Sequence, residues 1–242
     1  AVLVLAAVAL GAGSIVWRRL ATSSDTVPVS TALSEFKRGA KGDVSGPPRP
    51  GVYTYALRGT ECAGVLGVRL CRGFPSRARV ILTRRPGTII IEDDLSQDHL
   101  ETSRYAIHPD GLYLAWQRTR IVFGISQDDA ASTVPATLAL PAALRVGLHW
   151  KQHFSTVGVP VVTTNQVTRQ TTMIIGGTRV QVFQIDASSR IGGAHPGTET
   201  DSTWHSPSTG IDVRLIVHRR IGGTFPYTMD IDATLLSLKP LG

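Results

Sequence analysis

The stretch STWHSPSTGIDVRLIVHR, residues 202–219, carries the pattern that decides the fold. After Gly210, apolar residues occupy every second position: Ile211, Val213, Leu215 and Val217. This period of two is typical of an antiparallel strand with one buried face. The preceding SPSTG, residues 206–210, has the composition of a tight turn. The stretch therefore predicts a hairpin whose arms are TDSTWHS and IDVRLIVHR.

The same stretch places His205 beside Ser206, with Asp201 and Asp212 close by, and these are the residue types of a hydrolase's catalytic triad. Adjacent residues of a strand point to opposite faces, so the two side chains would not meet. The glycine pattern of a nucleophile elbow is also missing. We therefore interpret the stretch as structural. A cell-envelope hydrolase, in which His205, Asp212 or Asp230 converge in a cleft, is the alternative hypothesis.

Strand patterns continue in both directions from this hairpin. RVILT and GTIIIEDD predict one hairpin over residues 79–94, and the turn sequence HPDG predicts a long one over residues 101–123. The segments RIGGAHP (190–196) and RIGGTFP (220–226) echo each other, and Gly-Gly pairs between strands mark turns. None of these pairs opens a helix, which excludes a phosphate-binding glycine loop. Residues 124–146 contain two prolines and are interpreted as a crossover between two halves.

The pattern as a whole predicts a mainly β protein with about ten strands and almost no helix. Such a chain forms one large, strongly curled antiparallel sheet, a barrel or a sandwich. We expect this β-domain to occupy residues 51–242 and to follow a linker over residues 20–50, which is rich in Ser, Gly and Pro and contains one short helix.

The first 17 residues, AVLVLAAVALGAGSIVW, carry no charge. As a helix they would be about 25 Å long, slightly shorter than the hydrocarbon core of a bilayer. Trp17, Arg18 and Arg19 follow in the order of an aromatic belt and a basic anchor at the membrane interface. An uncleaved signal anchor, a secretory signal segment and a buried core helix compete, and we favour a single transmembrane helix over residues 1–19.

The two cysteines, Cys62 and Cys71, indicate the side of the membrane. They lie nine residues apart with glycines between them, a spacing that favours a small disulfide over two free thiols. Arg18 and Arg19 alone would place the remainder in the cytoplasm. We favour the disulfide, and therefore a single-pass protein of the cell membrane with its domain on the extracytoplasmic side.

The net charge of +7 and the pI of about 9.9 favour an acidic partner. Anionic lipid headgroups, a polyanionic wall polymer and nucleic acid are the three alternatives. No recognition-helix pattern, zinc-finger spacing or aromatic RNA-binding strand occurs in the sequence. We therefore expect contact with membrane lipids and no binding of nucleic acid.

Clusters of metal-ligating and acidic residues have simpler explanations. His149 and His153 would lie about 13 Å apart along a strand, too far for one ion. Asp230 and Asp232 share the polar face of their strand, where solvation is the default. The runs Glu92-Asp93-Asp94 and Asp128-Asp129 are interpreted as solvated charges at strand ends or in loops. The sequence thus predicts no catalytic residue, no metal site and no cofactor.

Four segments carry a resemblance: PRPGVYTYALRGTE (48–61), LPAALRVGLHWKQHF (140–154), STWHSPSTGIDVR (202–214) and TLLSLKP (234–240). In this order they resemble a group of uncharacterised actinobacterial proteins with one N-terminal membrane helix. The layout is similar to the LolA/LppX-type lipoprotein-binding and lipid-binding folds. The resemblance implies a half-barrel made of one curled antiparallel sheet and no catalytic residues. Nothing in it matches the cysteine pair at 62 and 71.

We therefore expect a non-enzymatic, membrane-anchored extracytoplasmic protein. It would bind a lipid or another hydrophobic ligand, or act as an accessory subunit for integral membrane protein partners. A spanning anchor favours the accessory subunit, because a shuttle gains little from a tether. Five aromatic residues are expected to face the core or a ligand groove: Tyr53, Tyr55, Trp116, Trp150 and Trp204.

Overall fold

The computed structural model describes residues 48–65, 67–123, 125–156 and 158–241, which form strands, turns and short connections. No helix within these ranges is long and apolar enough to cross a membrane. The transmembrane helix predicted over residues 1–19, with Trp17, Arg18 and Arg19, lies outside the described residues, as does the short helix predicted in the linker.

Thirteen strands make up the described part of the chain. They are β1 (Gly51–Val65), β2 (Val68–Gly73), β3 (Arg77–Arg85), β4 (Thr88–Ser96), β5 (His99–His108), β6 (Gly111–Phe123), β7 (Ile125–Pro141), β8 (His149–Thr156), β9 (Val159–Ile175), β10 (Thr178–Ile191), β11 (Gly197–Ser206), β12 (Ile211–Ile221) and β13 (Tyr227–Leu235).

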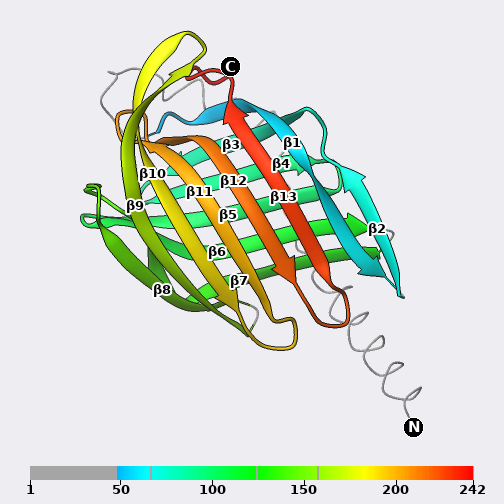
Figure 1. Ribbon diagram of the computed structural model, residues 1–242. Helices are drawn as coiled ribbons and strands as arrows, with labels where there is room; N and C mark the ends of the chain where they lie inside the picture. Colours follow the sequence, from blue (N-terminus) through cyan, green and yellow to red (C-terminus); the bar gives the residue numbers. More distant parts are fainter. Residues whose placement is uncertain (1–47, 66, 124, 157, 242) are drawn as a thin grey trace. The chain divides into compact units, whose positions relative to one another are not determined.

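The strands form one antiparallel sheet that closes on itself (Figure 1). Successive strands from β3 to β13 are neighbours, and β13 pairs with β1 through nine residue pairs, Tyr55–Ala63 with Leu235–Tyr227. The opposite edge of β1 pairs first with β3 and then with β2. Closure by the first and last long strands corrects the expected half-barrel of about ten strands to a closed barrel. The 15 residues of β1 explain the difference, because their length allows both edges to be paired.

Residues 124–146 were expected to be a crossover, but most of them form strand β7. The two prolines argue only against a long helix, and the structure has a strand there. The strand tolerates Pro135 because β7 pairs with β8 through one residue pair, Val134 with Ser155, so few ladder bonds are required along this edge. The hairpins predicted over residues 79–94, 101–123 and 202–219 are confirmed.

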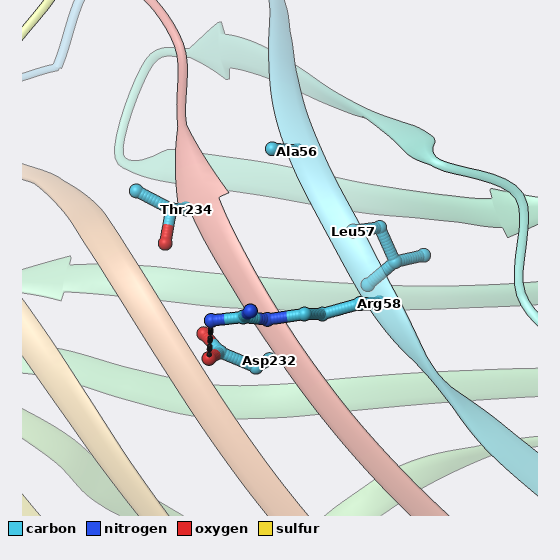
Figure 2. Close-up of a pocket in the computed structure, with 5 residues that line it drawn as sticks. All are labelled: Ala56, Leu57, Arg58, Asp232 and Thr234. Atoms are coloured by element: carbon cyan, nitrogen blue, oxygen red, sulfur yellow. Dashed lines mark hydrogen bonds and ion pairs between the residues drawn. The ribbon is translucent and has the colours of Figure 1, made fainter.

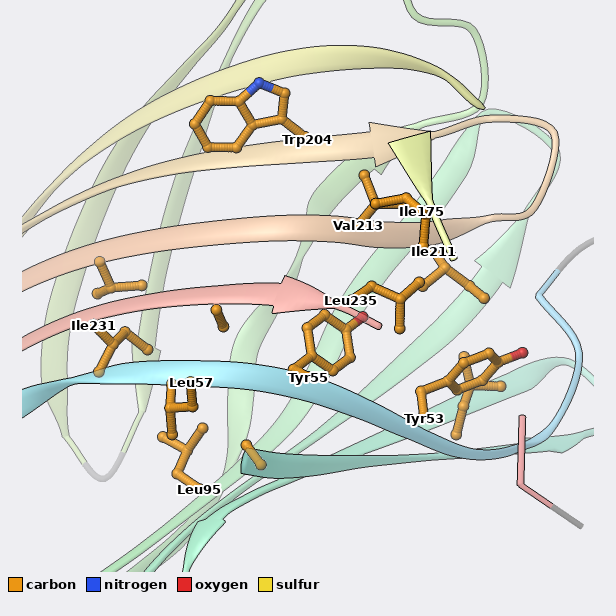
Figure 3. Close-up of a cluster of buried hydrophobic side chains, with 14 of the residues drawn as sticks. Tyr53, Tyr55, Leu57, Leu95, Ile175, Trp204, Ile211, Val213, Ile231 and Leu235 are labelled. Carbon is orange, nitrogen blue, oxygen red and sulfur yellow. The ribbon is translucent and has the colours of Figure 1, made fainter. Parts of the chain in front are cut away.

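The apolar core lies between the inner faces of β1, β3, β4 and β9–β13 (Figure 3). Tyr53, Leu57, Val213 and Leu235 are among its buried members. The end of β9 also reaches this core through Ile175. A Cβ atom on Gly176, in the turn between β9 and β10, would lie 3.1 Å from the carbonyl oxygen of Leu236. The β9–β10 turn therefore touches the segment that follows β13.

Glycine–proline contacts join the turns at the end of the barrel where β1 finishes. The amide nitrogen of Gly192 donates to the carbonyl of Pro160 at 2.9 Å, and that of Gly222 donates to Pro196 at 2.7 Å. Gly64, near the end of β1, donates to the carbonyl of Pro226 at 2.7 Å. The RIGG…P echo thus reflects a contact repeated from one hairpin end to the next, which confirms its interpretation as turns.

Cys62 and Cys71 form a disulfide, as the spacing predicted. They lie directly opposite each other in the β1–β2 register. The bond ties β2 to β1 beside Glu61 and Arg72, which form the neighbouring cross-strand pair. The disulfide therefore holds β2, which carries Arg72, beside the buried Glu61 of β1.

Candidate functional site

Charged side chains line the barrel interior where the apolar core ends. Along β1, the buried residues Tyr53, Tyr55 and Leu57 are followed on the same face by Glu61. Along β12, Val213 and Val217 are followed on the same face by Arg219. We call the charged group the interior charged cluster; it consists of Glu61, Arg72, His99, Glu101, Glu199, Arg219 and Tyr227.

Glu61 has no exposed surface and joins three other members of the cluster. Its Oε1 accepts a hydrogen bond from Arg72 Nε at 2.7 Å. Its Oε2 accepts one from the Tyr227 hydroxyl at 2.7 Å and lies 2.8 Å from His99 Nδ1. Burial alone would raise the pKa of the Glu61 carboxyl, but the bonds from His99, Tyr227 and Arg72 outweigh it and hold that pKa below its ordinary value.

His99 and Arg219 continue the cluster across the barrel. His99 Nε2 lies 3.1 Å from Glu101 Oε1, and the same oxygen accepts a bond from Arg219 at 2.7 Å. Arg219 Nε also donates to Glu199. Burial would lower the pKa of His99, but the bonds to Glu101 and Glu61 raise it to about 9. The His99 ring is therefore a cation at neutral pH, and the cluster links five barrel strands and β2.

Two further carboxyls on inner positions have raised pKa values. Burial, and then the charges of Glu101 and Asp212, raise the pKa of Asp93 to about 7. For Asp201 burial and the neighbouring Glu199 raise it to about 7, against the opposing effect of Arg219. Both groups therefore titrate near neutral pH, which is unusual for aspartate.

A second group of interior side chains is polar and uncharged. We call it the polar wall: Thr133, Thr137, Trp150, Gln152, Thr163, Asn165 and Ser189, on β7–β10. Gln152 donates to the carbonyl of Leu138 at 2.9 Å, and Thr163 pairs with Ser189 at 2.8 Å. Four buried side-chain polar atoms have no hydrogen-bond partner among the described residues, and three of them belong to the polar wall: Thr133 Oγ1, Trp150 Nε1 and Asn165 Nδ2. Trp150 and Asn165 face each other across the β8–β9 register.

The structure brings together two residues of the alternative triad. His205 Nδ1 lies 2.7 Å from Asp212 Oδ1, because a register shift between Trp204 and His205 places Asp212 opposite His205. The Ser206 hydroxyl bonds instead to Ser208 at 3.2 Å. Asp230 does not join them; it pairs with His218 and Arg220 on the outer face. Sequence parity could not reveal the His205–Asp212 contact, since it depends on the register shift.

Asp230 and Asp232 lie on the outer face of β13 and are paired with cations there. Asp232 binds Arg58 at 2.9 Å and Arg214 at 3.0 Å. Arg58 and Asp232 border a surface pocket of about 200 Å³, which Ala56, Leu57 and Thr234 also line (Figure 2). Hydrogen bonds from Arg214, against some burial, hold the pKa of Asp232 below its ordinary value. Two ionised, arginine-bound aspartates do not form the acid–base pair that hydrolysis requires.

The five aromatic residues expected on a core or ligand face do not share one surface. Tyr53, Tyr55 and Trp204 belong to the apolar core. The Tyr55 hydroxyl donates to the carbonyl of Asp212 at 2.5 Å. Trp150 lies in the polar wall, and Trp116 on β6 stacks with Arg104, whose guanidinium carbon is 5.2 Å from the ring centre. Of the five, Trp150 is the one whose buried ring nitrogen has no hydrogen-bond partner among the described residues, and it lies opposite the unpartnered amide of Asn165.

Metal ligands do not gather in the described part of the chain: no group of three or more His, Cys, Asp or Glu side chains there is arranged to hold an ion. His149 and His153 both lie on the exposed face of β8. Sequence analysis missed the interior charged cluster. One signal in the sequence could have revealed it. The alternation that places Leu57 and Val217 on the inner face also places the charged residues Glu61 and Arg219 on that face.

The chain is similar in structure to a solved protein. No protein-family model matches the chain, and no curated protein matches it. A crystal structure of the hypothetical lipoprotein YmcC from Escherichia coli K12 aligns with 90% of this chain and 99% of its own, at 13% sequence identity and a TM-score of 0.33.

Proposed function

We propose that this barrel is a non-enzymatic binding domain for an amphipathic ligand of the lipid type. The observation that carries the proposal is the polar wall, where buried donors of Trp150 and Asn165 have no partner among the described residues. A buried polar group without a hydrogen bond costs about 1–3 kcal/mol. A ligand that supplies acceptors at this wall would remove that cost.

The size of the barrel supports an interior ligand. A barrel of eight strands is just wide enough for its own side chains to fill it. Here β1 and β3–β13 form the closed circuit, which makes twelve strands. The apolar core is built on β1, β3, β4 and β9–β13, whereas the polar wall lies on β7–β10. An amphipathic molecule matches an interior with both kinds of surface.

The chemistry of the unpartnered atoms indicates the part of the ligand that binds there. Trp150 Nε1 and Asn165 Nδ2 are both donors, and neither carries a charge. They fit neutral acceptor oxygens, such as the ester or amide carbonyls between the headgroup and the acyl chains of a lipid.

The absence of catalysis is part of the proposal, and two observations support it. Glu61, Glu101 and Glu199 are each held by arginine, histidine or tyrosine partners. Ser206, the nearest hydroxyl to the His205–Asp212 pair in sequence, bonds to Ser208. Neither arrangement presents a free nucleophile beside a general base.

The test is lipid co-purification with the full chain in a mild detergent, followed by solvent extraction and mass spectrometry. We expect one amphipathic species in a fixed ratio to protein. Asn165→Leu removes the unpartnered side-chain amide of Asn165 at similar size and should lower the occupancy at least several-fold. Gln166→Leu, the next residue of β9 on its exposed face, is the matched control and should leave occupancy unchanged. Equal occupancy in both variants, or protein that carries no amphiphile, would reject the proposal.

A second candidate, an accessory subunit on a membrane protein complex, is favoured by a different feature. Val68 and Leu70 on β2 and Phe225 in the β12–β13 turn are large apolar side chains with 41–59% of their surface exposed. The hydrogen bond between Gly64 and Pro226 brings the β1–β2 hairpin beside that turn. If this apolar patch binds a partner, other polypeptides should co-purify in a fixed ratio, and Val68→Ser with Phe225→Ser should release them.

A further inference from the structure

The end of the barrel where β1 begins carries a concentration of exposed basic side chains. We call this end the basic rim. Its exposed basic residues are Arg49, Arg84, Arg85, Arg145, Arg179 and Lys239. None of the six forms an ion pair with a carboxylate among the described residues.

Hydrogen bonds and close contacts place the connections of the rim side by side. Ile107 donates to the carbonyl of Gly87, and Ala142 donates to that of Asp110, which links three successive connections. The C-terminal segment runs along the start of β1, because Leu236 donates to Thr54 and Leu241 to Val52. The Gly176 turn touches that same segment at Leu236.

Acidic residues are scarce in the connections of the rim. The described residues between strands at this end, with the segments flanking β1 and β13, contain one carboxylate, Asp110. A second exposed carboxylate, Asp212, lies at the start of β12, where it pairs with His205. At the opposite end, the described connections 74–76, 97–98, 192–196 and 222–226 contain no lysine or arginine. When strand ends are counted as well, four exposed arginines lie toward the opposite end, Arg69, Arg77, Arg120 and Arg190, against six exposed basic residues at the rim. The rim therefore carries more exposed basic residues than the opposite end.

Exposed apolar side chains accompany the cations on the basic rim. Val146, Ile174, Leu236 and Leu241 expose 55%, 70%, 40% and 61% of their surface. Basic residues interspersed with exposed aliphatic residues are what a protein offers to an anionic bilayer, where cations meet headgroups and aliphatic groups enter the interface. A nucleic-acid site would combine its cations with aromatic or base-reading side chains, and the exposed apolar residues of this rim are aliphatic.

We propose that the basic rim docks on the surface of an anionic lipid bilayer. The polypeptide N-terminal to Pro48 joins the barrel at this same end, since β1 starts at Gly51. Docking would point the opposite end, with the patch of Val68, Leu70 and Phe225, away from the membrane. The proposal does not depend on a ligand inside the barrel.

Hydrogen–deuterium exchange of the full chain tests the docking even if another segment already holds the chain to the membrane. The probes are nanodiscs of phosphatidylcholine and nanodiscs of an equal mixture of phosphatidylcholine and phosphatidylglycerol. We expect slower exchange at residues 142–148 and 236–241 in the anionic discs only. Residues 192–196 and 222–226, at the opposite end, should exchange equally in both.

Two matched triple variants separate the rim from net charge. Arg84→Glu, Arg85→Glu and Arg145→Glu together should abolish the protection. Arg69→Glu, Arg77→Glu and Arg190→Glu change the net charge equally, at exposed positions near the opposite end, and should preserve it. If the rim variant does not fold, a high salt concentration serves in its place, because salt screens exposed charges and should remove the protection of the unaltered chain.

Three results would overturn the proposal. Equal protection in neutral and anionic discs would show that charge plays no role. Equal effects of the two triple variants would show that the rim is not the site. Protection by soluble polyphosphate or a short DNA duplex, without anionic lipid, would assign the rim to a soluble acidic polymer.

Discussion

Glu61 and Asp201 are carboxyls on inner positions of the same barrel, and their surroundings move their pKa values in opposite directions. Glu61 receives bonds from Arg72, Tyr227 and His99, which outweigh its burial. Asp201 lies close to Glu199, and Arg219 only partly offsets burial. The hydrogen-bonding and charged neighbours of each carboxyl, more than its degree of burial, therefore decide which of these two groups is ionised at neutral pH.

Asp201→Asn should stabilise the protein at high pH. The pKa of Asp201 is raised from 3.8 to about 7, so the folded state holds its proton more tightly than the unfolded chain. That contribution to stability is complete below pH 3.8 and is lost as the pH rises through about 7. An amide cannot ionise, so the variant should be more stable than the wild type by about 1–2 kcal/mol at about pH 8 and nearly equal at about pH 4. Urea unfolding at the two pH values measures this difference.

Asp232→Asn is the control on the outer face, and its sign is opposite. Arg214 and Arg58 lower the pKa of Asp232, so its contribution is present above the unfolded value of 3.8 and is lost as the pH falls. Its removal should weaken the protein slightly at about pH 8, by less than about 1 kcal/mol. If Asp201→Asn instead destabilises the protein at about pH 8, the ionised Asp201 carboxylate does not lower the stability of the folded state, and the raised pKa assigned to Asp201 is wrong.

Among the elements, β1 has the most demanding position because both of its edges are paired. Gly59 lies where three strands meet: β13 on one side, and β3 and β2 on the other. Its φ of +146° is one that residues with a side chain rarely adopt. A Cβ atom there would lie 2.0 Å from the carbonyl oxygen of Asp230. The absence of a side chain at this position allows β13 to approach β1.

Gly59→Ala should therefore disrupt the closure of the barrel. The added methyl group would meet backbone atoms, which cannot move aside as a flexible side chain can, and we expect a loss of about 3 kcal/mol or more. Gly87→Ala is the matched control: its φ is also positive, at +69°, but no atom lies within 4 Å of the added Cβ. That variant should lose only about 1–2 kcal/mol. Chemical unfolding compares the two, and equal losses would show that the close approach is unimportant.

The elements that sequence predicted well are those encoded by neighbouring residues. The 202–219 hairpin combines alternating apolar residues with a turn composition, and both signals are local. The pairing of β1 with β13 joins Tyr55 to Leu235, and no local pattern specifies a partner so distant in the chain. Strand β7 was missed for another reason: Pro135 and Pro141 argue against a long helix, and the segment was interpreted as a crossover. A strand that is hardly paired on its β8 side can nevertheless contain proline.

The candidate site was harder to predict than the fold. Inner-face parity extends from Leu57 to Glu61 and from Val217 to Arg219, so the inward direction of these charges was accessible. Which of these charges pair with one another was not accessible, because it depends on the closed barrel bringing side chains of β5 into contact with those of β1 and β12. The polar wall was equally hidden, since Trp150 and Asn165 gain meaning only when the β8–β9 register sets them opposite each other.

At the scale of the whole molecule, pairing around the barrel is uneven. Strands β9 and β10 share 14 residue pairs, and β1 and β13 share nine. Strands β7 and β8 share one. The polar wall lies directly behind this weak seam, with Thr133 on β7 and Trp150 on β8. The seam is thus the place in the described barrel where the fewest hydrogen bonds separate interior from solvent.

The barrel should open first between β7 and β8. Amide exchange of peptides from residues 126–155 should be faster than that of β9–β13, because fewer cross-strand bonds protect these amides. A disulfide engineered between Val134→Cys and Ser155→Cys, the residues paired across the seam, should slow this exchange under oxidising conditions and restore it on reduction. Uniform exchange around the barrel, or first exchange at β1 and β13, would contradict the prediction.

The pairing of β1 with β13 has a consequence for the time course of synthesis. β1 is made before the other strands, and the strand that completes its outer edge is made last, some 170 residues later. Until then one edge of β1 has no partner in the sheet. At about 5–20 residues per second this interval lasts on the order of 10–30 seconds. The nascent chain therefore depends on whatever shields this strand edge until β13 emerges.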